Sequence, residues 1–233
     1  MAKKITHEVP SLWEMNPIWN VLTDSEKEYI HQHAQAYAYR KNEVIHSEGD
    51  TPTHMMMIIS GTLRVYKGGV GNRTAIIRML KPHDLFAYRA IIAGGTYNTS
   101  VSCCEPCEIY FIEREAFMYI IKENAQFCYL MMVEMAKDLG GSDTRSVNIG
   151  QKHIRGRLAE TLLYLKDTYG LDDDQATISM YMSREDLANL SNMTTSNAIR
   201  TLANFAEEEV ISIDGRKIKI LDMQRLKHIN QLG

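Results

Sequence analysis

Four side chains in the C-terminal third of the chain are suited to hydrogen bonding with the edges of nucleic-acid bases. They are Thr195, Ser196, Asn197 and Arg200, which are short hydrogen-bonding groups followed by one long donor. On a helix over residues 195–205, we expect these side chains to point outward. Groups of this kind match the donor and acceptor pattern of the DNA major groove. The sequence therefore predicts a surface that can distinguish base pairs.

Two short helices joined by a tight turn must position this surface. Ser183 can cap the first helix with Asp186 three residues on, and Thr194 can cap the second. Asn192 tolerates the left-handed backbone conformation that the turn needs. The apolar positions that we expect to face inward are Leu187, Ala188, Leu190, Ile199, Leu202 and Phe205. The pattern predicts a helix-turn-helix, with an ordinary helical hairpin as the alternative.

A β-hairpin is predicted directly after the second helix. Alternating apolar residues over 210–213 and 216–220 flank the pair Asp214-Gly215, which is a strong hairpin-turn signal. A hairpin in this place turns a helix-turn-helix into a winged helix. Arg216, Lys217 and Lys219 would then bring positive charge to the wing, where phosphates bind.

Composition favours a folded, cytoplasmic protein with more than one domain. The chain has 233 residues, 45% of them hydrophobic and 24% charged, with a net charge of −3. We find no apolar run that approaches a membrane span, and no signal-peptide core. Four cysteines in a chain of this length are no disulfide framework. The weak net charge argues against non-specific coating of DNA and permits a local basic face.

Short β-type runs fill the region between Ala36 and Gln126. We expect strands over residues 36–40, 44–46, 55–59, 63–67, 74–80, 99–103 and 108–112. Turn residues separate them, including the glycine-rich segment 68–72. Many short strands at such spacing predict a small antiparallel barrel or jelly roll. The fold class is therefore α+β, and we expect residues 1–22 to be irregular and a helix to run from Thr23 toward Ala38.

A long helix is predicted from Asn124 onward. Its heptad seam comprises Cys128, Met132, Met135, Leu139, Ser142, Ser146 and Ile149. The alternative is one face of a helix that lies on the barrel. A helix of this length needs a partner along its side, and we expect a two-stranded dimer seam. Gly140-Gly141 interrupts the pattern, and residues 148–152 are the expected hinge. A further amphipathic helix is predicted over residues 153–169, ended by Gly170.

The order of barrel, long helix, hinge and winged helix resembles the CRP/FNR family of bacterial transcription regulators. Three segments carry the resemblance: residues 48–66, residues 154–163 and residues 183–200. It implies a cyclic-nucleotide-binding-like sensor domain over 1–123, a dimerisation helix and hinge over 124–150, and a winged helix-turn-helix over 151–233. It also implies a homodimer that binds double-stranded DNA and works with RNA polymerase, and not an enzyme.

The phosphate-binding segment of that family falls on residues 84–100. Cyclic-AMP binders carry Gly-Glu and Arg-Ser pairs there, and this chain has Ala87-Tyr88 and Asn98-Thr99 in their places. Without the carboxylate and the guanidinium, we expect no tight binding of cyclic AMP. The residues expected to line a cavity for another, unidentified small molecule are Ala87, Tyr88, Arg89, Tyr97, Asn98, Thr99, Ser142 and Asp143.

The resemblance also assigns roles in DNA binding. Arg200 falls on a family arginine and is expected to contact guanine, while Thr195 and Ser196 replace the family's Arg-Glu pair. We expect Arg184 and Thr194 to touch phosphates, which position the protein without specifying sequence. Asn197 and Lys217 complete the predicted DNA-binding set.

Three other constellations are alternatives. Cys103, Cys104, Cys107 and Cys128 could suggest an iron–sulfur cluster, but adjacent residues on a strand point to opposite faces. Haem sensing is a further option without a selective ligand spacing. His31-Gln-His33 could suggest a metal-dependent cupin-like enzyme, but residues i and i+2 diverge on a helix. We therefore predict no metal site and no cofactor.

Overall fold

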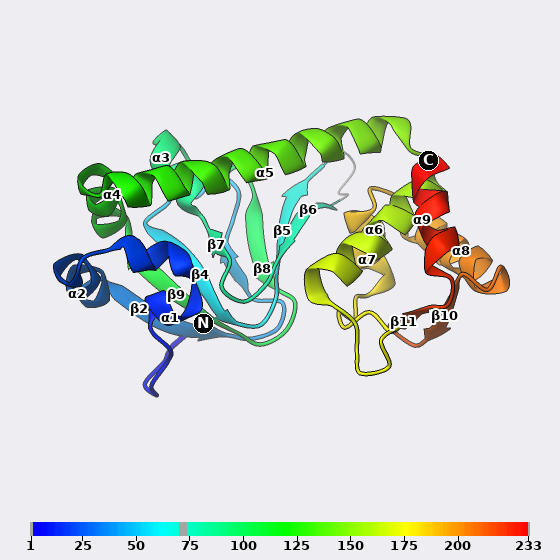
Figure 1. Ribbon diagram of the computed structural model, residues 1–233, viewed down its shortest axis with the longest axis horizontal. Coiled ribbons are helices and arrows are strands. Elements are labelled where there is room, and N and C mark those ends of the chain that lie inside the picture. The colour runs from blue at the N-terminus through cyan, green and yellow to red at the C-terminus, as the bar shows by residue number, and fades with distance from the viewer. Residues whose placement is uncertain (1, 70–73, 233) are drawn as a thin grey trace. The chain divides into compact units, whose positions relative to one another are not determined.

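A computed structural model describes residues 2–69 and 74–232 and divides into two compact units (Figure 1). One unit holds residues up to Lys67 together with Ile77–Gly140. The other holds Gly68–Ile76 and the residues from Gly141 onward. Of the predicted turn over 68–72, residues 70–72 lie outside the described part. The three domain ranges given above remain a prediction.

Two antiparallel sheets build the first unit. One has the order β1-β2-β9-β4-β7 and the other β3-β8-β5-β6. Their strands are β1 Lys3–Lys4, β2 Ala34–Tyr39, β3 Val44–His46, β4 His54–Ser60, β5 Leu63–Gly68, β6 Thr74–Leu80, β7 Leu85–Phe86, β8 Ser100–Cys103 and β9 Cys107–Glu113. All seven predicted strands are present, within two residues at each end, whereas β1 and β7 were not predicted. The expected antiparallel β architecture of the N-terminal region is confirmed.

Strand β4 explains how the sequence builds two hydrophobic layers. Met56 and Ile58 pack into the core between the sheets, with Leu63, Val101 and Ile109. Their neighbours in sequence point to the opposite face of the sheet. That face packs against helices through a second cluster, which includes Met55, Met57, Ile59, Trp19, Phe117 and Phe127. A central strand buried on both faces is therefore continuously apolar.

The N-terminal segment is more regular than predicted. It forms α1 (Leu12–Met15) and the 3₁₀ helix η1 (Pro17–Val21), so the expectation of irregular structure over 1–22 is wrong. Buried Trp19 anchors this segment to the core. Thr23 and Glu26 form the predicted capping box at the start of α2 (Asp24–Gln32). That helix ends well before Ala38 because the chain enters β2 at Ala34.

Three helices follow within or after the strands. The sequence did not predict α3 (Tyr88–Ala93) or α4 (Arg114–Glu123). The long helix α5 spans Ala125–Gln151 and includes Gly140 and Gly141 without a break. Residues 148–151 belong to this helix, so the expected hinge over 148–152 overlaps the break only at Lys152. The helical break lies at Lys152 and His153.

The C-terminal elements match the predicted winged helix. They are α6 Ile154–Tyr169, α7 Arg184–Leu190, α8 Thr195–Glu207, β10 Ile211–Asp214, β11 Lys217–Ile220 and α9 Met223–Leu232. Buried side chains from these elements form the core, including Leu158, Leu162, Leu187, Phe205 and Leu226. Helices α6 and α9 pack against each other, as do α7 and α8. None of the described helices has the length and apolar character that a membrane crossing requires.

Candidate DNA interface and effector cavity

Side-chain caps fix both helices of the predicted reading unit. Ser183 Oγ accepts a hydrogen bond of 3.0 Å from the backbone N–H of Asp186, at the start of α7. Thr194 Oγ1 accepts one of 3.3 Å from the backbone N–H of Asn197, at the start of α8. Asn192, in the turn between them, has a positive φ of 49°. The predicted caps and the left-handed turn residue are confirmed.

The buried face of α8 differs from the predicted one at Ile199. Ala198, Thr201, Leu202 and Phe205 are buried, and they recur at steps of three and four residues. Ile199 lies outside this stripe and is 51% exposed, so its expected inward position is wrong.

A hydrogen-bonded pair also explains a polar residue inside this unit. Ser191 is 3% exposed, and its hydroxyl donates a 2.8 Å hydrogen bond to Thr161 Oγ1 on α6. Thr161 in turn donates to the carbonyl of Arg157 at 3.0 Å. Buried hydroxyls with partners cost little compared with unpaired ones. The polar position therefore fits the predicted register of the helix-turn-helix.

The predicted base-reading side chains share one exposed face of α8. Thr195, Ser196 and Arg200 are exposed, and Asn197 is half-buried. Arg200 Nη2 donates a 2.8 Å hydrogen bond to Asn197 Oδ1, which orients the guanidinium along the helix. Ile199 also lies on this exposed surface. It is a further candidate for contact with bases, and the sequence reasoning placed it on the wrong face of the helix.

A two-point contact holds the far end of α8 to α6. Arg155 Nη1 and Nη2 donate to Glu208 Oε1 and Oε2 at 2.8 and 2.9 Å. The guanidinium also lies 5.0 Å from the centre of the Phe205 ring. The Arg155 hydrogen bond lowers the pKa of Glu208. Two parallel hydrogen bonds fix the orientation of Arg155 relative to Glu208 more firmly than a single one would.

The wing turn differs by one residue from the prediction. Asp214 pairs with Lys217, so the two turn residues are Gly215 and Arg216 instead of Asp214 and Gly215. Gly215 has a positive φ of 57°, which suits glycine. Arg184, at the start of α7, donates a 2.6 Å hydrogen bond to the Gly215 carbonyl. The side chain predicted to bind a phosphate thus also ties the wing tip to α7.

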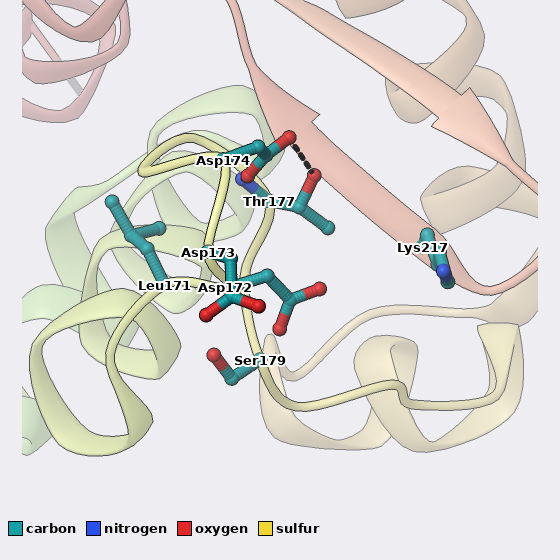
Figure 2. A pocket seen from close by; sticks show the side chains of 7 residues that line it. All are labelled: Leu171, Asp172, Asp173, Asp174, Thr177, Ser179 and Lys217. Atoms are coloured by element: carbon teal, nitrogen blue, oxygen red, sulfur yellow. Dashed lines mark hydrogen bonds between the residues drawn. The ribbon is translucent and has the colours of Figure 1, made fainter.

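An acidic pocket borders the wing. Figure 2 shows Asp172, Asp173 and Asp174 across the pocket from Lys217 on the wing strand. Asp174 accepts hydrogen bonds from Thr177 and forms a 3.2 Å ion pair with Lys219. The Thr177 backbone hydrogen bond lowers the pKa of Asp174 most. Lys219 is therefore partly neutralised, which leaves Arg216 and Lys217 as the exposed cations of the wing.

A small cavity lies where the effector was expected in the first unit. Its volume is about 30 Å³, and its lining includes Ala87, Tyr88, Arg89, Tyr97, Asn98 and Thr99. These are six of the eight predicted residues. The other two, Ser142 and Asp143, are exposed and are not part of this lining. The cavity also involves His46, Val65, Arg78, Phe86, Ala90 and Val101, which the sequence reasoning did not select.

Stacked and buried rings form one wall of the cavity. The His46 and Tyr97 rings lie 3.7 Å apart between centroids. Burial lowers the pKa of His46 to about 4 and raises that of Tyr97 to about 12, so both side chains are uncharged near neutral pH. The Gly49 N–H donates to the Tyr97 carbonyl at 2.7 Å. The turn at residues 48–50, which begins the segment 48–66 named above, thus holds the cavity wall in place.

The predicted dimer seam is only partly exposed. Met132 and Leu139 are 55% and 64% exposed on α5. Met135 packs against the helix-facing core of its own unit, and Cys128 is half-buried. Tyr129 and Val147, which the heptad did not include, are exposed. The exposed apolar row is therefore rotated slightly from the predicted seam. Ser142, Ser146 and Ile149 are exposed.

The cysteine and histidine constellations are not assembled as metal sites. Among the described residues, no group of three or more His, Cys, Asp or Glu is placed to hold a metal ion. All four cysteines are free thiols. A hydrogen bond between Cys103 and Cys107 raises the pKa of Cys103 and lowers that of Cys107. His33 lies at the end of α2, with Nδ1 2.8 Å from the Tyr29 carbonyl.

An antiparallel sensor barrel followed by a long helix and a winged helix defines a class of DNA-binding regulators. Two family models match the chain. The cyclic nucleotide-binding domain covers residues 37–124, and the Crp-like helix-turn-helix domain covers residues 156–229. The chain belongs to the CRP/FNR family of transcription regulators. DNA binding, dimer formation and control of transcription are properties of this family.

Individual relatives are distant but span the whole architecture. The CRP-like cAMP-activated global transcriptional regulator of Mycobacterium tuberculosis is 21% identical over 193 residues, covering 82% of this chain and 86% of that protein. A CRP/FNR-family regulator from Eubacterium rectale has a TM-score of 0.77 at 22% identity, covering 93% and 98% of the two chains. FixK2 from Bradyrhizobium japonicum has a TM-score of 0.76 at 20% identity, covering 84% and 97%. The structural matches support the same fold.

Proposed function

We propose that this protein is a homodimeric, sequence-specific transcription regulator that reads DNA with the exposed N-terminal half of α8. The observation that carries the proposal is the capped helix with Thr195, Ser196 and Arg200 on one exposed face. Short donors and an arginine there can reach base edges in the major groove. Arg184, Thr194 and Lys217 would hold phosphates. Arg184 is bonded to the wing at Gly215, and Asn197 orients Arg200.

Ile199 extends the proposed reading surface. Ile199 is exposed beside Arg200, on the face that we propose to enter the groove, so it can offer a base an apolar contact. The methyl group of thymine is the apolar feature of the major groove. We therefore assign Ile199 a contact with a thymine methyl, beside a guanine contact by Arg200.

Selection of binding sites from a random DNA pool tests these assignments. The Arg200→Ala variant is expected to lose about 1–3 kcal/mol of binding and to relax the preference at one base pair. Ile199→Ala should relax a neighbouring position that prefers thymine. Arg40→Ala removes an exposed arginine from the first unit and is expected to leave the selected motif unchanged. An unaltered motif for Arg200→Ala would show that the assigned register on DNA is wrong.

The regulatory input is proposed to be a small molecule or a redox change acting through the first unit, and not cyclic AMP. The pairs Ala87-Tyr88 and Asn98-Thr99 line the cavity where cyclic-AMP binders have Gly-Glu and Arg-Ser. They supply neither a carboxylate for ribose nor an Arg-Ser pair for phosphate. About 30 Å³ is also far below the size of a nucleotide, since one water needs roughly 10–15 Å³ on a similar measure. The relative from Mycobacterium tuberculosis is named as cAMP-activated, and we propose a different effector here.

RNA polymerase is the proposed protein partner. Regulators of this family bind promoter DNA, and recruitment or exclusion of polymerase is the direct way for such binding to change transcription. Transcription in vitro from a promoter that contains the selected motif, with purified polymerase, tests this proposal and separates an activator from a repressor.

A further inference from the structure

A carboxylate on helix α5 is hydrogen-bonded to two residues of the effector cavity. Arg78 Nη1 donates to Asp138 Oδ1 at 2.6 Å, and Tyr88 Oη donates to Asp138 Oδ2 at 2.8 Å. Arg78 and Tyr88 both line the cavity, whereas Asp138 comes from α5. Both oxygen atoms of Asp138 are thus used to join the helix to two cavity residues. All three residues belong to the first unit.

The cavity itself is suited to a negative charge. Its described lining contains two guanidinium groups, Arg78 and Arg89, and no acidic residue. Arg78 Nε is buried without a hydrogen-bond partner, and so is Nδ1 of His46, a residue that is 8% exposed. Buried polar nitrogens of this kind are normally paired, and an unpaired one costs free energy. A ligand with several acceptor oxygens would satisfy the arginine donors.

We propose that the cavity takes a small anion of the carboxylate or phosphate type, which competes with Asp138 for Arg78 and Tyr88. The proposal rests on the proposed function, because it names the effector chemistry of the same sensor site. Asp138 acts as an internal substitute for the effector: its carboxylate occupies the donors until an external anion replaces it. The anion then frees α5 from Tyr88 and Arg78.

The competition links ligand size to helix release. We call the bonding of Asp138 to Arg78 and Tyr88 the latch. While the latch is closed the cavity has room for about two water molecules, so an anion of several atoms enters only as Asp138 moves away. Binding is therefore weakened by the fraction of molecules in which the latch is closed. Asp138 lies one residue from exposed Leu139, so its release acts directly on the surface that we propose for dimerisation.

Calorimetry on the full chain without DNA, with acetate, succinate, inorganic phosphate and cyclic AMP as probes, tests the proposal. Asp138→Asn removes the competing charge with little change in shape and is expected to bind at least one small anion about tenfold more tightly than the wild type. Tyr88→Phe should change the affinity much less, because it removes both a bond of Asp138 and a donor that the anion would use. Glu134→Gln removes a carboxylate one turn away on α5, where it pairs with Lys137, and should bind like the wild type.

Hydrogen exchange of α5 supplies the second readout. Amides around Asp138 should exchange faster in Asp138→Asn, or when the small anion is added to the wild type. Arg78→Met, checked for folding by thermal denaturation, should lose anion binding. The proposal is overturned if Asp138→Asn binds none of the small anions more tightly than the wild type, or if Arg78→Met binds them equally well. Failure of the proposed function would instead be seen in the DNA selection, which needs no anion.

Discussion

Ala87 holds a backbone conformation that favours glycine. Its φ is 69°, in the left-handed region, directly before α3. This conformation costs a residue with a Cβ atom roughly 1–2 kcal/mol. The sequence comparison placed Ala87 where the family's cyclic-AMP binders have glycine, so this chain keeps the backbone path of that segment without its usual residue.

Replacement of Ala87 by glycine is therefore expected to stabilise the protein. Relief of the left-handed strain outweighs the added freedom of the unfolded chain by about 1 kcal/mol. Urea denaturation measures the change in the free energy of unfolding. Ala93→Gly, in the ordinary helical backbone of α3, is the matched control and should lose stability instead. A loss of stability for Ala87→Gly would contradict the strain argument.

Residue types on α8 show why its buried face was only partly predictable. Leu202 and Phe205 are large and were placed correctly, whereas Ala198 is small and gave no clear signal. Ile199 was assigned inward because it is apolar, although it lies one position away from the stripe of buried residues. The periodic set 198, 201, 202 and 205 was present in the sequence and would have excluded it.

At the scale of elements, strands were found more readily than the short helices between them. Strands β4 and β9 can be recognised in the sequence because their apolar residues are continuous or alternate and are bounded by turns. α4 was missed because its apolar residues follow directly on β9, so the change of period was hidden. Its buried Ala116, Phe117 and Ile120 fit helical spacing, which was the available signal. The cavity residues His46 and Arg78 come from separate strands, and only the folded sheets bring them together.

The glycine pair in α5 gives a prediction for this element. A Cβ atom added at Gly141 would meet no atom within 4 Å, and the backbone there is helical. Gly141→Ala should therefore raise the free energy of unfolding by about 0.5–1 kcal/mol, through helix propensity alone. Chemical denaturation measures the effect, and Gly150→Ala near the helix end is a control with a smaller expected gain. A loss of stability would reveal a second molecule packed closely on this glycine.

At the scale of the whole molecule, the proposed tasks fall on different units. The first unit contains the cavity and Asp138, and the second contains α8, which we propose to read DNA, and the wing. Family membership supplies the remaining requirement, which is a dimer that presents two reading helices to half-sites on DNA. The order of the units was predictable from three motifs in sequence. The rotated apolar row on α5 was not, because heptad spacing alone does not say which side of a helix its own barrel covers.

The apolar row on α5 provides the test of assembly. Leu139 is 64% exposed, and a partner helix would bury it. Leu139→Glu would then place two like charges across a close helix pair, without disturbing a buried residue of the protomer. We expect the variant to sediment as a monomer at concentrations where the wild type is a dimer, and to lose most of its affinity for a two-half-site operator.

Lys137→Glu is the matched control for that experiment. It introduces the same side chain two residues away, at an exposed position on another side of α5. It should leave both the dimer and the DNA affinity intact, because no partner helix is expected there. Anion binding by the first unit should survive in either variant, since Arg78 and Tyr88 are untouched. A dimer that persists in Leu139→Glu would mean that the two copies meet through a surface other than this row.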